Sequence, residues 1–361
     1  MDFALHVPIN RVSFGQVSVN ILREIFQRGL SPEIFPIGEV DTHTFRLEPE
    51  FLSWLEQCIN RSYQTHQRTN PTFKLWHISG SLESLSKNQL LFTFHETDEA
   101  TPVEVNIVKN NAKVLFSSKY SKDVFETFGC KNVGTLPLGF DNNSFKVLNK
   151  KYLSDRISFG VGGKLEKRKQ HHRILNLWAK KYGNQHEYEL NCALFNPHLP
   201  PEMQEAFRRQ ALEGKHYWNI NFLPYMENNE AYNDFLNSNN IFIGTSSAEG
   251  WGLPEFQSVA IGKHAVILNA TGYKEWATED NSVLIQPNGK VKLYDGVFFK
   301  EGMPFSQGSG YDWSEKDFYD ALDKAVNRFK ANPVNEEGLK LQNKFTYKNT
   351  VDKILSELSE L

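Results

Sequence analysis

The chain is poor in cysteine and contains no long apolar run. Cys58, Cys130 and Cys192 are its three cysteines among 361 residues, and no two of them have the spacing of a metal or redox motif. This sparse, odd number predicts a reducing compartment, not a disulfide framework. No stretch approaches the ~18 apolar residues of a membrane span, and MDFALHVPINRVSFG lacks the regions of a signal peptide. We therefore expect a cytoplasmic protein without a transmembrane segment.

The chain also lacks an excess of charge of either sign. Its 40 Lys and Arg residues face 43 Asp and Glu residues, which gives a net charge of −3. Proteins that owe their affinity to phosphate backbones carry a positive excess. The composition therefore disfavours nucleic acid as a partner, and a local basic groove is the open alternative. At roughly 100–200 residues per domain, the length predicts two domains.

Short apolar strand patterns alternate with amphipathic helical patterns in two series. The first has strand patterns at 3–9, 33–37, 75–79, 90–95, 113–117 and 133–140 and helical patterns at 17–28, 51–59 and 121–128. The second has strand patterns at 157–161, 188–193, 220–223, 241–244 and 265–268 and helical patterns at 169–182, 230–236 and 254–261. The polar segment 141–154 between them predicts a linker. Such alternation predicts two parallel sheets covered by helices, with ligands beyond the carboxyl ends of the strands.

The stretch GTSSAEGWGLPEF (244–256) has the character of an anion site after a strand. Gly250 and Gly252 let a ligand approach the backbone, and Pro254 suits the first turn of a helix. Backbone N–H groups at that helix end attract negative charge. Glu249, expected to be an exposed loop residue, would direct its carboxylate at ligand hydroxyls. The structural alternative is a plain strand–turn–helix.

The stretch FGVGGKLEKRK (159–169) carries a glycine pair at a strand end, followed by cations. Four cations fall within six residues, namely Lys164, Lys167, Arg168 and Lys169. Cations in this position suit a diphosphate. The order of a Walker loop is absent, and the alternative is a solvated charged turn.

Together these stretches resemble the GT-B glycosyltransferases of the large retaining group (GT4-like) that includes sucrose and mannosyl transferases. The resemblance covers roughly residues 90–361. It rests on Gly163-Lys164-Leu165 with Lys169, Glu249-Gly250-Trp251-Gly252-Leu253-Pro254, Pro137-Leu138-Gly139-Phe140-Asp141, Thr271-Gly272-Tyr273-Lys274-Glu275, and Phe345-Thr346-Tyr347 followed by a helix.

The resemblance implies two Rossmann-like, doubly wound parallel-sheet domains that face a cleft. The N-terminal, acceptor-side domain would span 1–145, and the nucleotide-sugar-binding domain 146–344, with helix 345–361 packing back on the first. The implied reaction moves a sugar, with retention, from a nucleoside-diphosphate donor to an acceptor. The donor is then a substrate, and no cofactor is implied. The acceptor stays open among a glycan, a lipid, a protein and a modified nucleic-acid base.

The resemblance also implies roles for particular residues. Catalytic roles fall on His95, Glu249 and Lys169, while the structural alternative for His95 is a strand-end hydrogen bonder. Glu249 would touch the donor sugar's hydroxyls, and Lys169 would stabilise the leaving diphosphate. The donor-binding residues would be Gly15, Gly163, Lys164, Lys169, Glu249, Gly250, Trp251, Gly252, Leu253 and Gln257.

Two positions depart from the family pattern. Gln257 stands where the family has a second Glu, which costs charge-assisted hydrogen bonding, and Lys164 stands where it has Arg, which costs a bidentate fork. The Gln257 change supports one alternative, a sugar-nucleotide-binding protein of the same fold without turnover. A nucleotide-sugar epimerase of that fold is a further alternative.

No metal site is expected, since Asp-x-Asp is absent. The acidic run 96–99 is the best metal candidate, but cations and helix-end amides neutralise a diphosphate without a metal. The segment 283–314 reads as an aromatic-rich insertion, which we expect to pack on the second domain, with an acceptor surface as the alternative.

Overall fold

The computed structural model describes residues 2–150, 152 and 155–361. Lys151, Leu153 and Ser154, which belong to the expected linker, lie outside the described residues. The chain forms two compact units. Unit 1 comprises residues 1–144, 302–307 and 342–361, and unit 2 comprises residues 145–301 and 308–341. In the described part of the chain, no helix combines the length and the apolar composition needed to cross a bilayer.

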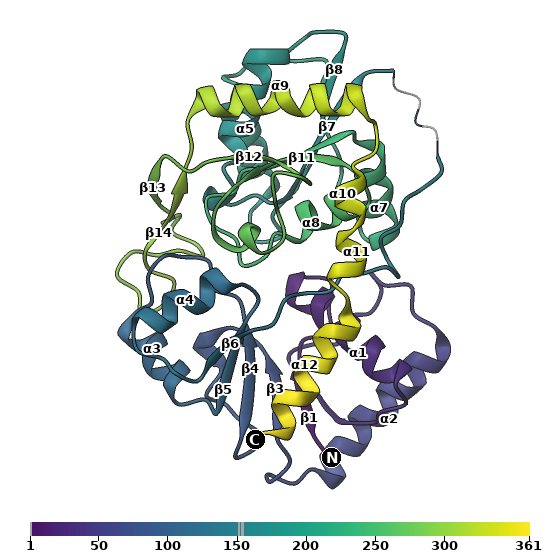
Figure 1. Cartoon of the computed structure of the whole chain (residues 1–361), viewed down its shortest axis with the longest axis vertical. Helices are drawn as coiled ribbons and strands as arrows, with labels where there is room; N and C mark the ends of the chain where they lie inside the picture. The colour runs from purple at the N-terminus through teal and green to yellow at the C-terminus, as the bar shows by residue number, and fades with distance from the viewer. Residues whose placement is uncertain (1, 151, 153–154) are drawn as a thin grey trace. The chain divides into compact units, whose positions relative to one another are not determined.

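Unit 1 is a parallel six-stranded sheet covered by helices (Figure 1). Its strand order is β2-β1-β3-β4-β5-β6. The strands are β1 (Ala4–Val7), β2 (Glu33–Pro36), β3 (Thr72–Leu75), β4 (Gln89–Thr93), β5 (Lys113–Phe116) and β6 (Val133–Thr135). The helical elements are α1 (Ser13–Gln27), α2 (Pro49–Thr65), η1 (Ile78–Gly80), α3 (Pro102–Lys109), α4 (Lys119–Thr127) and α12 (Tyr347–Ser359).

The C-terminal helix α12 belongs to unit 1, where it packs against α1 (Figure 1). Phe140 forms a parallel bridge to Thr346. A Cβ on Gly139 would lie 2.2 Å from the Tyr347 nitrogen, so this approach requires glycine. The motif segments around Phe140 and Tyr347 thus close unit 1 together.

Unit 2 repeats this architecture with the strand order β12-β11-β10-β7-β8-β9, all parallel. Its strands are β7 (Ile157–Lys164), β8 (Tyr188–Phe195), β9 (Ile220–Phe222), β10 (Ile241–Gly244), β11 (His264–Leu268) and β12 (Val283–Ile285), with the separate antiparallel pair β13 (Gly289–Lys292) and β14 (Ser309–Asp312). The helical elements are η2 (Lys167–Lys169), α5 (His171–Tyr182), α6 (Pro201–Ala211), α7 (Asn229–Ser238), α8 (Leu253–Ala260), η3 (Thr271–Glu275), α9 (Glu315–Ala331) and α10 (Glu336–Leu339); α11 (Leu341–Lys344) spans the boundary between the units.

The predicted doubly wound α/β class is confirmed, with two errors in the strands of unit 1. The expected strand 75–79 is wrong, because β3 ends at Leu75 and the apolar residues after it form a turn. The expected strand 133–140 stops at Thr135, since Pro137 cannot donate to a strand ladder. Apolar runs that continue past a strand end explain both errors.

The aromatic residues of 283–314 pack into hydrophobic clusters, as expected for most of this segment. Leu293 and Phe299 pack with Ala248, and Trp313 joins the main core of unit 2. The stretch 302–307 between β13 and β14 belongs instead to unit 1. There the Ser306 N–H donates to Glu104 Oε1 at 2.9 Å.

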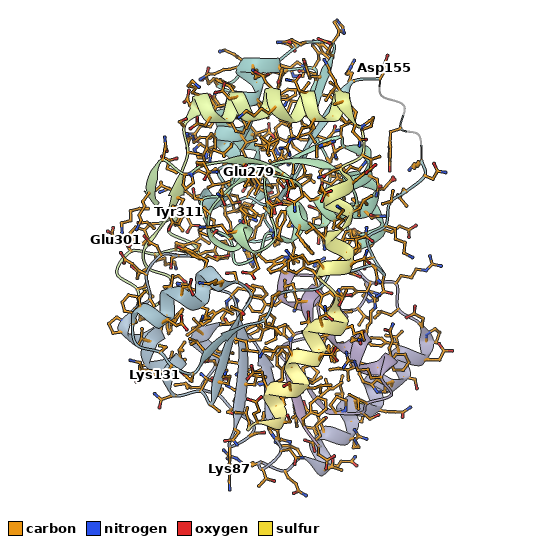
Figure 2. The ribbon with its side chains drawn as sticks, in the orientation of Figure 1. Lys87, Lys131, Asp155, Glu279, Glu301 and Tyr311 are labelled. Carbon is orange, nitrogen blue, oxygen red and sulfur yellow. The ribbon has the colours of Figure 1, made fainter. Side chains whose placement is uncertain are left out.

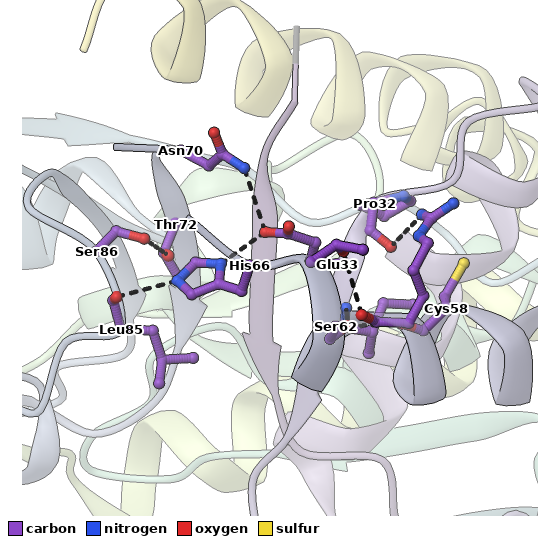
Figure 3. Close-up of polar contacts among 12 residues, drawn as sticks. Pro32, Glu33, Cys58, Ser62, His66, Asn70, Thr72, Leu85 and Ser86 are labelled. Atoms are coloured by element: carbon purple, nitrogen blue, oxygen red, sulfur yellow. Dashed lines mark hydrogen bonds and ion pairs between the residues drawn. The ribbon is translucent and has the colours of Figure 1, made fainter. Parts of the chain in front are cut away.

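A polar network ties α2 to the sheet edge of unit 1 (Figure 3). His66 Nδ1 lies 2.6 Å from Glu33 Oε2, and its Nε2 lies 3.0 Å from the Leu85 carbonyl oxygen. Ser62 accepts the Ile34 N–H at 2.6 Å. By contrast, Lys87 and Lys131 project from the surface of the same unit (Figure 2).

Candidate functional site

Two loops of unit 2 carry most of the expected site residues. After β7 the chain continues to β8 on one side of the sheet, and after β10 to β11 on the other. The adjacent strands β7 and β10 therefore mark the switch point, where open α/β sheets bind ligands beyond the strand ends. The segments 164–170 and 245–252 follow these strands.

Gly163 allows the backbone conformation that leads into the loop after β7. Its φ is +121°, a conformation that a side chain would strain. A Cβ there would lie 3.7 Å from Lys169 Cε and Nζ and 4.0 Å from His171 Cε1. Lys169 thus lies close to the glycine.

Hydrogen bonds join the two loops directly. The Ser247 N–H donates to the Arg168 carbonyl at 2.7 Å, and Gln170 Nε2 donates to Ser247 Oγ at 2.7 Å. Arg168 Nη1 donates to the Ala248 carbonyl at 2.7 Å. The cationic loop and the Glu249 loop are therefore one structural unit.

Cations and carboxylates alternate across this junction. Glu166 pairs with Lys164 and, through Oε2, with Arg168 Nε at 2.8 Å. Glu249 Oε1 lies 3.0 Å from Arg168 Nη1 and pairs with Lys169 Nζ. We call Lys164, Glu166, Arg168, Lys169 and Glu249 the charge network. Its three cations and two carboxylates leave one net positive charge.

Glu249 is buried, with an exposed fraction of 5%, which corrects the expectation of an exposed loop residue. The reason is its pairing with two cations that cover it. Burial acts to raise the pKa of Glu249, but Arg168 and Lys169 outweigh it and lower that pKa to about 2. The carboxylate is thus ionised and can accept hydrogen bonds from hydroxyl groups.

The helix α8 begins next to this carboxylate without a side-chain cap. Its N-cap, Gly252, has a φ of +84°, and a Cβ there would lie 2.2 Å from Tyr273 Cε1. The first-turn N–H groups of an uncapped helix favour an anionic ligand. Gly250 and Leu253 also belong to this turn, as the motif predicted.

Trp251 contributes backbone to this turn while its ring is buried. The indole is 2% exposed and packs edge-on against Phe256 with ring centroids 5.3 Å apart. Trp276 Nε1 donates to the Trp251 carbonyl at 2.9 Å. The Gly272 N–H donates to the Glu249 carbonyl at 2.9 Å. Hydrogen bonds from Gly272 in η3 and from Trp276, which follows η3, therefore hold the loop around Trp251 in place.

Glu255 is a second buried carboxyl group in the same turn, 2% exposed. Burial raises its pKa to about 7; Lys169 opposes this shift and the nearby Glu249 charge supports it. Tyr273 is fully buried beside it, and burial together with Glu255 raises the pKa of its hydroxyl. One carboxyl group of the site is thus ionised and the other is largely neutral below pH 7.

Gln257 lies on α8 with an exposed fraction of 8%. Two other expected site residues, Gly15 and His95, belong to unit 1. Gly15 lies in the first turn of α1, where a Cβ would be 2.0 Å from the Asn10 carbonyl oxygen. His95 is buried, and its Nε2 lies 3.0 Å from the Glu99 carbonyl oxygen. Burial lowers the pKa of His95, which favours the neutral ring.

The sequence prediction missed Arg168, Glu166 and Glu255 as site residues. Arg168 and Glu166 were visible only as members of a charged run. Glu166, 6% exposed, pairs with Lys164 and Arg168 of its own loop, and Arg168 in turn contacts Ala248 and Glu249, some 80 residues away. Within the described residues, no group of three or more His, Cys, Asp or Glu side chains could hold a metal ion.

No model of a known protein family matches the chain, and no curated protein sequence matches it. Solved structures do match. Sucrose-phosphate synthase from Thermosynechococcus elongatus is 11% identical, with a TM-score of 0.68 over 100% of this chain and 98% of that one. Anabaena Alr3699/HepE, in complex with UDP-glucose, is 13% identical, with a TM-score of 0.66 over all of both chains.

A UDP-forming α,α-trehalose-phosphate synthase from Burkholderia xenovorans is 13% identical, with a TM-score of 0.66 over 99% of each chain. At such low identity, these matches concern the fold. The chain has the GT-B fold, with two doubly wound parallel-sheet domains, as the sequence predicted.

Proposed function

We propose that the chain is a glycosyltransferase of the retaining, GT4-like group that takes its sugar from a nucleoside diphosphate. The charge network carries this proposal. It holds a buried, ionised Glu249 between two cations, beside an uncapped helix N-terminus at the switch point of unit 2. A sugar diphosphate needs both features, hydrogen-bond acceptors for its hydroxyls and positive groups for its phosphates.

The roles of the residues follow from their charges. Lys169, Arg168 and the α8 N–H groups would neutralise the diphosphate, and Glu249 would accept hydrogen bonds from sugar hydroxyls. In the reaction, the bond from the anomeric carbon to the diphosphate oxygen breaks and a bond to the acceptor oxygen forms. The acceptor proton passes to the leaving diphosphate on the same face. Cations that stabilise the growing charge on the diphosphate lower the barrier.

The similarity to the UDP-glucose complex of Alr3699/HepE and to a UDP-forming trehalose-phosphate synthase supports uridine diphosphate as the first donor nucleotide to test. The experiment is calorimetric titration with UDP, ADP and GDP, followed by incubation with UDP-, ADP- and GDP-sugars without acceptor. We expect one nucleotide to bind and its sugar conjugate to hydrolyse slowly. Glu249→Ala should abolish the hydrolysis but retain nucleotide binding, because it removes the acceptor of the sugar hydroxyls and leaves Arg168 and Lys169 in place. Absence of nucleotide binding would contradict the proposal.

The same incubation separates the alternatives. A binding protein without turnover would bind the nucleotide and leave every conjugate intact. An epimerase would return the conjugate with an inverted sugar carbon and release no free diphosphate. Release of free sugar and nucleoside diphosphate supports a transferase, because water then replaces the acceptor.

A further inference from the structure

Unit 1 carries a group of partly exposed aromatic rings, which we call the aromatic platform: Phe14, Trp76, His77 and Phe94. Phe14 is its centre, with ring centroids 6.0 Å from Trp76, 4.5 Å from His77 and 5.0 Å from Phe94. Trp76 and His77 are themselves 5.3 Å apart. None of the four is buried, whereas core rings such as Phe73 and Phe92 are fully buried. The platform therefore presents aromatic surface that the core does not use.

The platform lies where a doubly wound unit binds ligands. Phe14 is in the first turn after β1, Trp76 and His77 directly follow β3, and Phe94 directly follows β4. These three strands are neighbours in the sheet. The chain leaves β1 for β2 on one side and β3 for β4 on the other, so β1 and β3 flank the switch point of unit 1.

A buried lysine fixes the loop that carries Trp76 and His77. Lys74, 1% exposed, donates from Nζ to the carbonyls of Gly80 and Glu83 at 2.7 and 2.8 Å. A Cβ on Gly80 would lie 2.8 Å from two atoms of the Trp76 indole, so glycine is needed for the ring to lie there. Burying a lysine is costly, and here its hydrogen bonds hold the loop in one conformation. A rigid loop is what a preorganised binding surface requires.

We propose that this platform binds a saccharide, and hence that the acceptor of the transfer is a carbohydrate. The identification of this saccharide as the acceptor rests on the proposed function. The binding of a saccharide by the platform does not depend on it. Sugar rings have apolar C–H faces that pack on aromatic rings and hydroxyls that need polar partners. Exposed polar residues lie within three positions of platform residues in the sequence, among them Arg11, Ser13 and Ser79. Apolar contacts with a few polar groups are typical of small-ligand sites.

A nucleic-acid strand also stacks on aromatic rings, but it needs a positively charged groove for its backbone. The exposed cation next to the platform residues in the sequence is Arg11, whereas the exposed Lys87 lies at the other end of its loop, next to β4, and the buried Lys74 is engaged with carbonyls. A carbohydrate fits this charge distribution better. Oligonucleotide binding is an outcome that the experiment tests.

The experiment is ligand-observed saturation-transfer NMR with the full chain and a panel of glucose, mannose, N-acetylglucosamine, maltotriose and cellotriose. The variants are Trp76→Ala and His77→Ala. Trp218→Ala is the matched control, because Trp218 is also partly exposed, at 39%, but stacks on Arg156 and His186 in unit 2. We expect at least one sugar to bind, with affinity lowered about tenfold by Trp76→Ala and unchanged by Trp218→Ala.

The proposal is overturned if no sugar of the panel binds at millimolar concentration, or if both platform variants bind as the wild type does. Binding of a single-stranded oligonucleotide to the platform in place of any sugar also overturns it. His77→Ala decides the case if Trp76→Ala fails to fold, since His77 is exposed. UDP titration of the wild type reports on the proposed function separately, so either idea can fail while the other stands.

Discussion

Arg168 Nη1 lies 3.0 Å from Glu249 Oε1, and this contact joins the loop after β7 to the loop after β10. The same arginine pairs through Nε with Glu166 at 2.8 Å. Arg168 therefore sits between two buried carboxylates, and Lys169 shares one of them. An anionic ligand would compete with Glu249 for these two cations. The strength of that competition determines how the site responds to mutation.

Removal of either cation should slow the reaction. We expect Lys169→Ala and Arg168→Ala each to lower kcat, which corresponds to a rise of about 3 kcal/mol in the activation free energy. Each variant removes a positive group beside the charge that develops on the diphosphate. Lys167→Ala is the control, since Lys167 is exposed and donates to the Tyr294 carbonyl at 2.9 Å. Steady-state kinetics on the three variants test this. An essential Lys167 beside a dispensable Lys169 would show that the motif alignment is wrong.

Loss of Glu249 should affect both activity and stability. In Glu249→Ala, Arg168 and Lys169 keep their charges without their shared carboxylate, and breaking a buried ion pair costs about 3 kcal/mol. We expect transfer to be abolished and the free energy of unfolding in urea to fall by that amount. Glu279→Ala is the control, because Glu279 is exposed (Figure 2), and its effect should stay within about 0.5 kcal/mol. Unchanged stability of Glu249→Ala would mean that the ion pairs contribute little.

The sequence predicted the positions of the site loops better than the ion pairs and hydrogen bonds between them. The strand Ile241–Gly244 and the glycine turn around Trp251 were predicted because apolar runs and glycines act locally. The roles of Arg168 and Glu166 were not predicted, because a run of charges does not reveal which members turn inward. That choice depends on Ser247 and Glu249, which only the folded sheet brings near.

The helix α3 was missed for a different reason. The helix α3 begins with a capping box in which Thr101 accepts the Glu104 N–H and Glu104 accepts the Thr101 N–H. The capping box was readable in the sequence. The short apolar face of α3, however, gave only a weak helical periodicity of apolar residues. The membership of 302–307 in unit 1 was not readable, since it depends on the packing of Phe305 against the core of that unit.

The pair of His66 and Glu33 should stabilise unit 1 most at low pH (Figure 3). Burial alone would lower the pKa of His66, but its hydrogen bonds to Glu33 and to the Leu85 carbonyl outweigh burial and raise it. A raised folded-state pKa gives stability that is present below the unfolded value of about 6.5 and lost as the pH rises through the folded value. Urea unfolding of His66→Gln should therefore show a larger loss at pH 6 than at pH 9. The exposed His43→Gln should show no such difference.

Transfer should proceed without a divalent cation. The positive groups beside the site, Arg168 and Lys169, already neutralise a diphosphate together with the α8 N–H groups. We expect initial rates in excess EDTA to equal those with added Mg²⁺ or Mn²⁺. Activity that is lost in EDTA and restored by either cation would contradict this expectation. The acidic run 96–99 would then be the first candidate for the metal site.

Replacement of Glu255 by glutamine should stabilise the protein increasingly as the pH rises from about 4.3 to about 7, and by a constant amount above that. The unfolded carboxyl group ionises near pH 4.3, while burial raises the folded-state pKa of Glu255 to about 7. Between these values the folded chain retains a proton that the unfolded chain has lost, so stability falls as the pH rises through this window. Glutamine is a neutral isostere without this dependence. We therefore expect the free energy of unfolding of Glu255→Gln to match that of the wild type at pH 4 and to exceed it at pH 8 by about 4 kcal/mol.

Glu249 does not obscure this comparison, because its pKa of about 2 keeps it ionised throughout the range from pH 4 to pH 8. Urea unfolding at pH 4, 5.5 and 8 measures the difference, and the exposed Glu279→Gln is the matched control. A constant difference between Glu255→Gln and the wild type at all three pH values would mean that Glu255 ionises normally. In that case Glu249 and Glu255 would both be ionised near the start of α8, and Lys169 would have to compensate both charges, since it acts on the pKa of each.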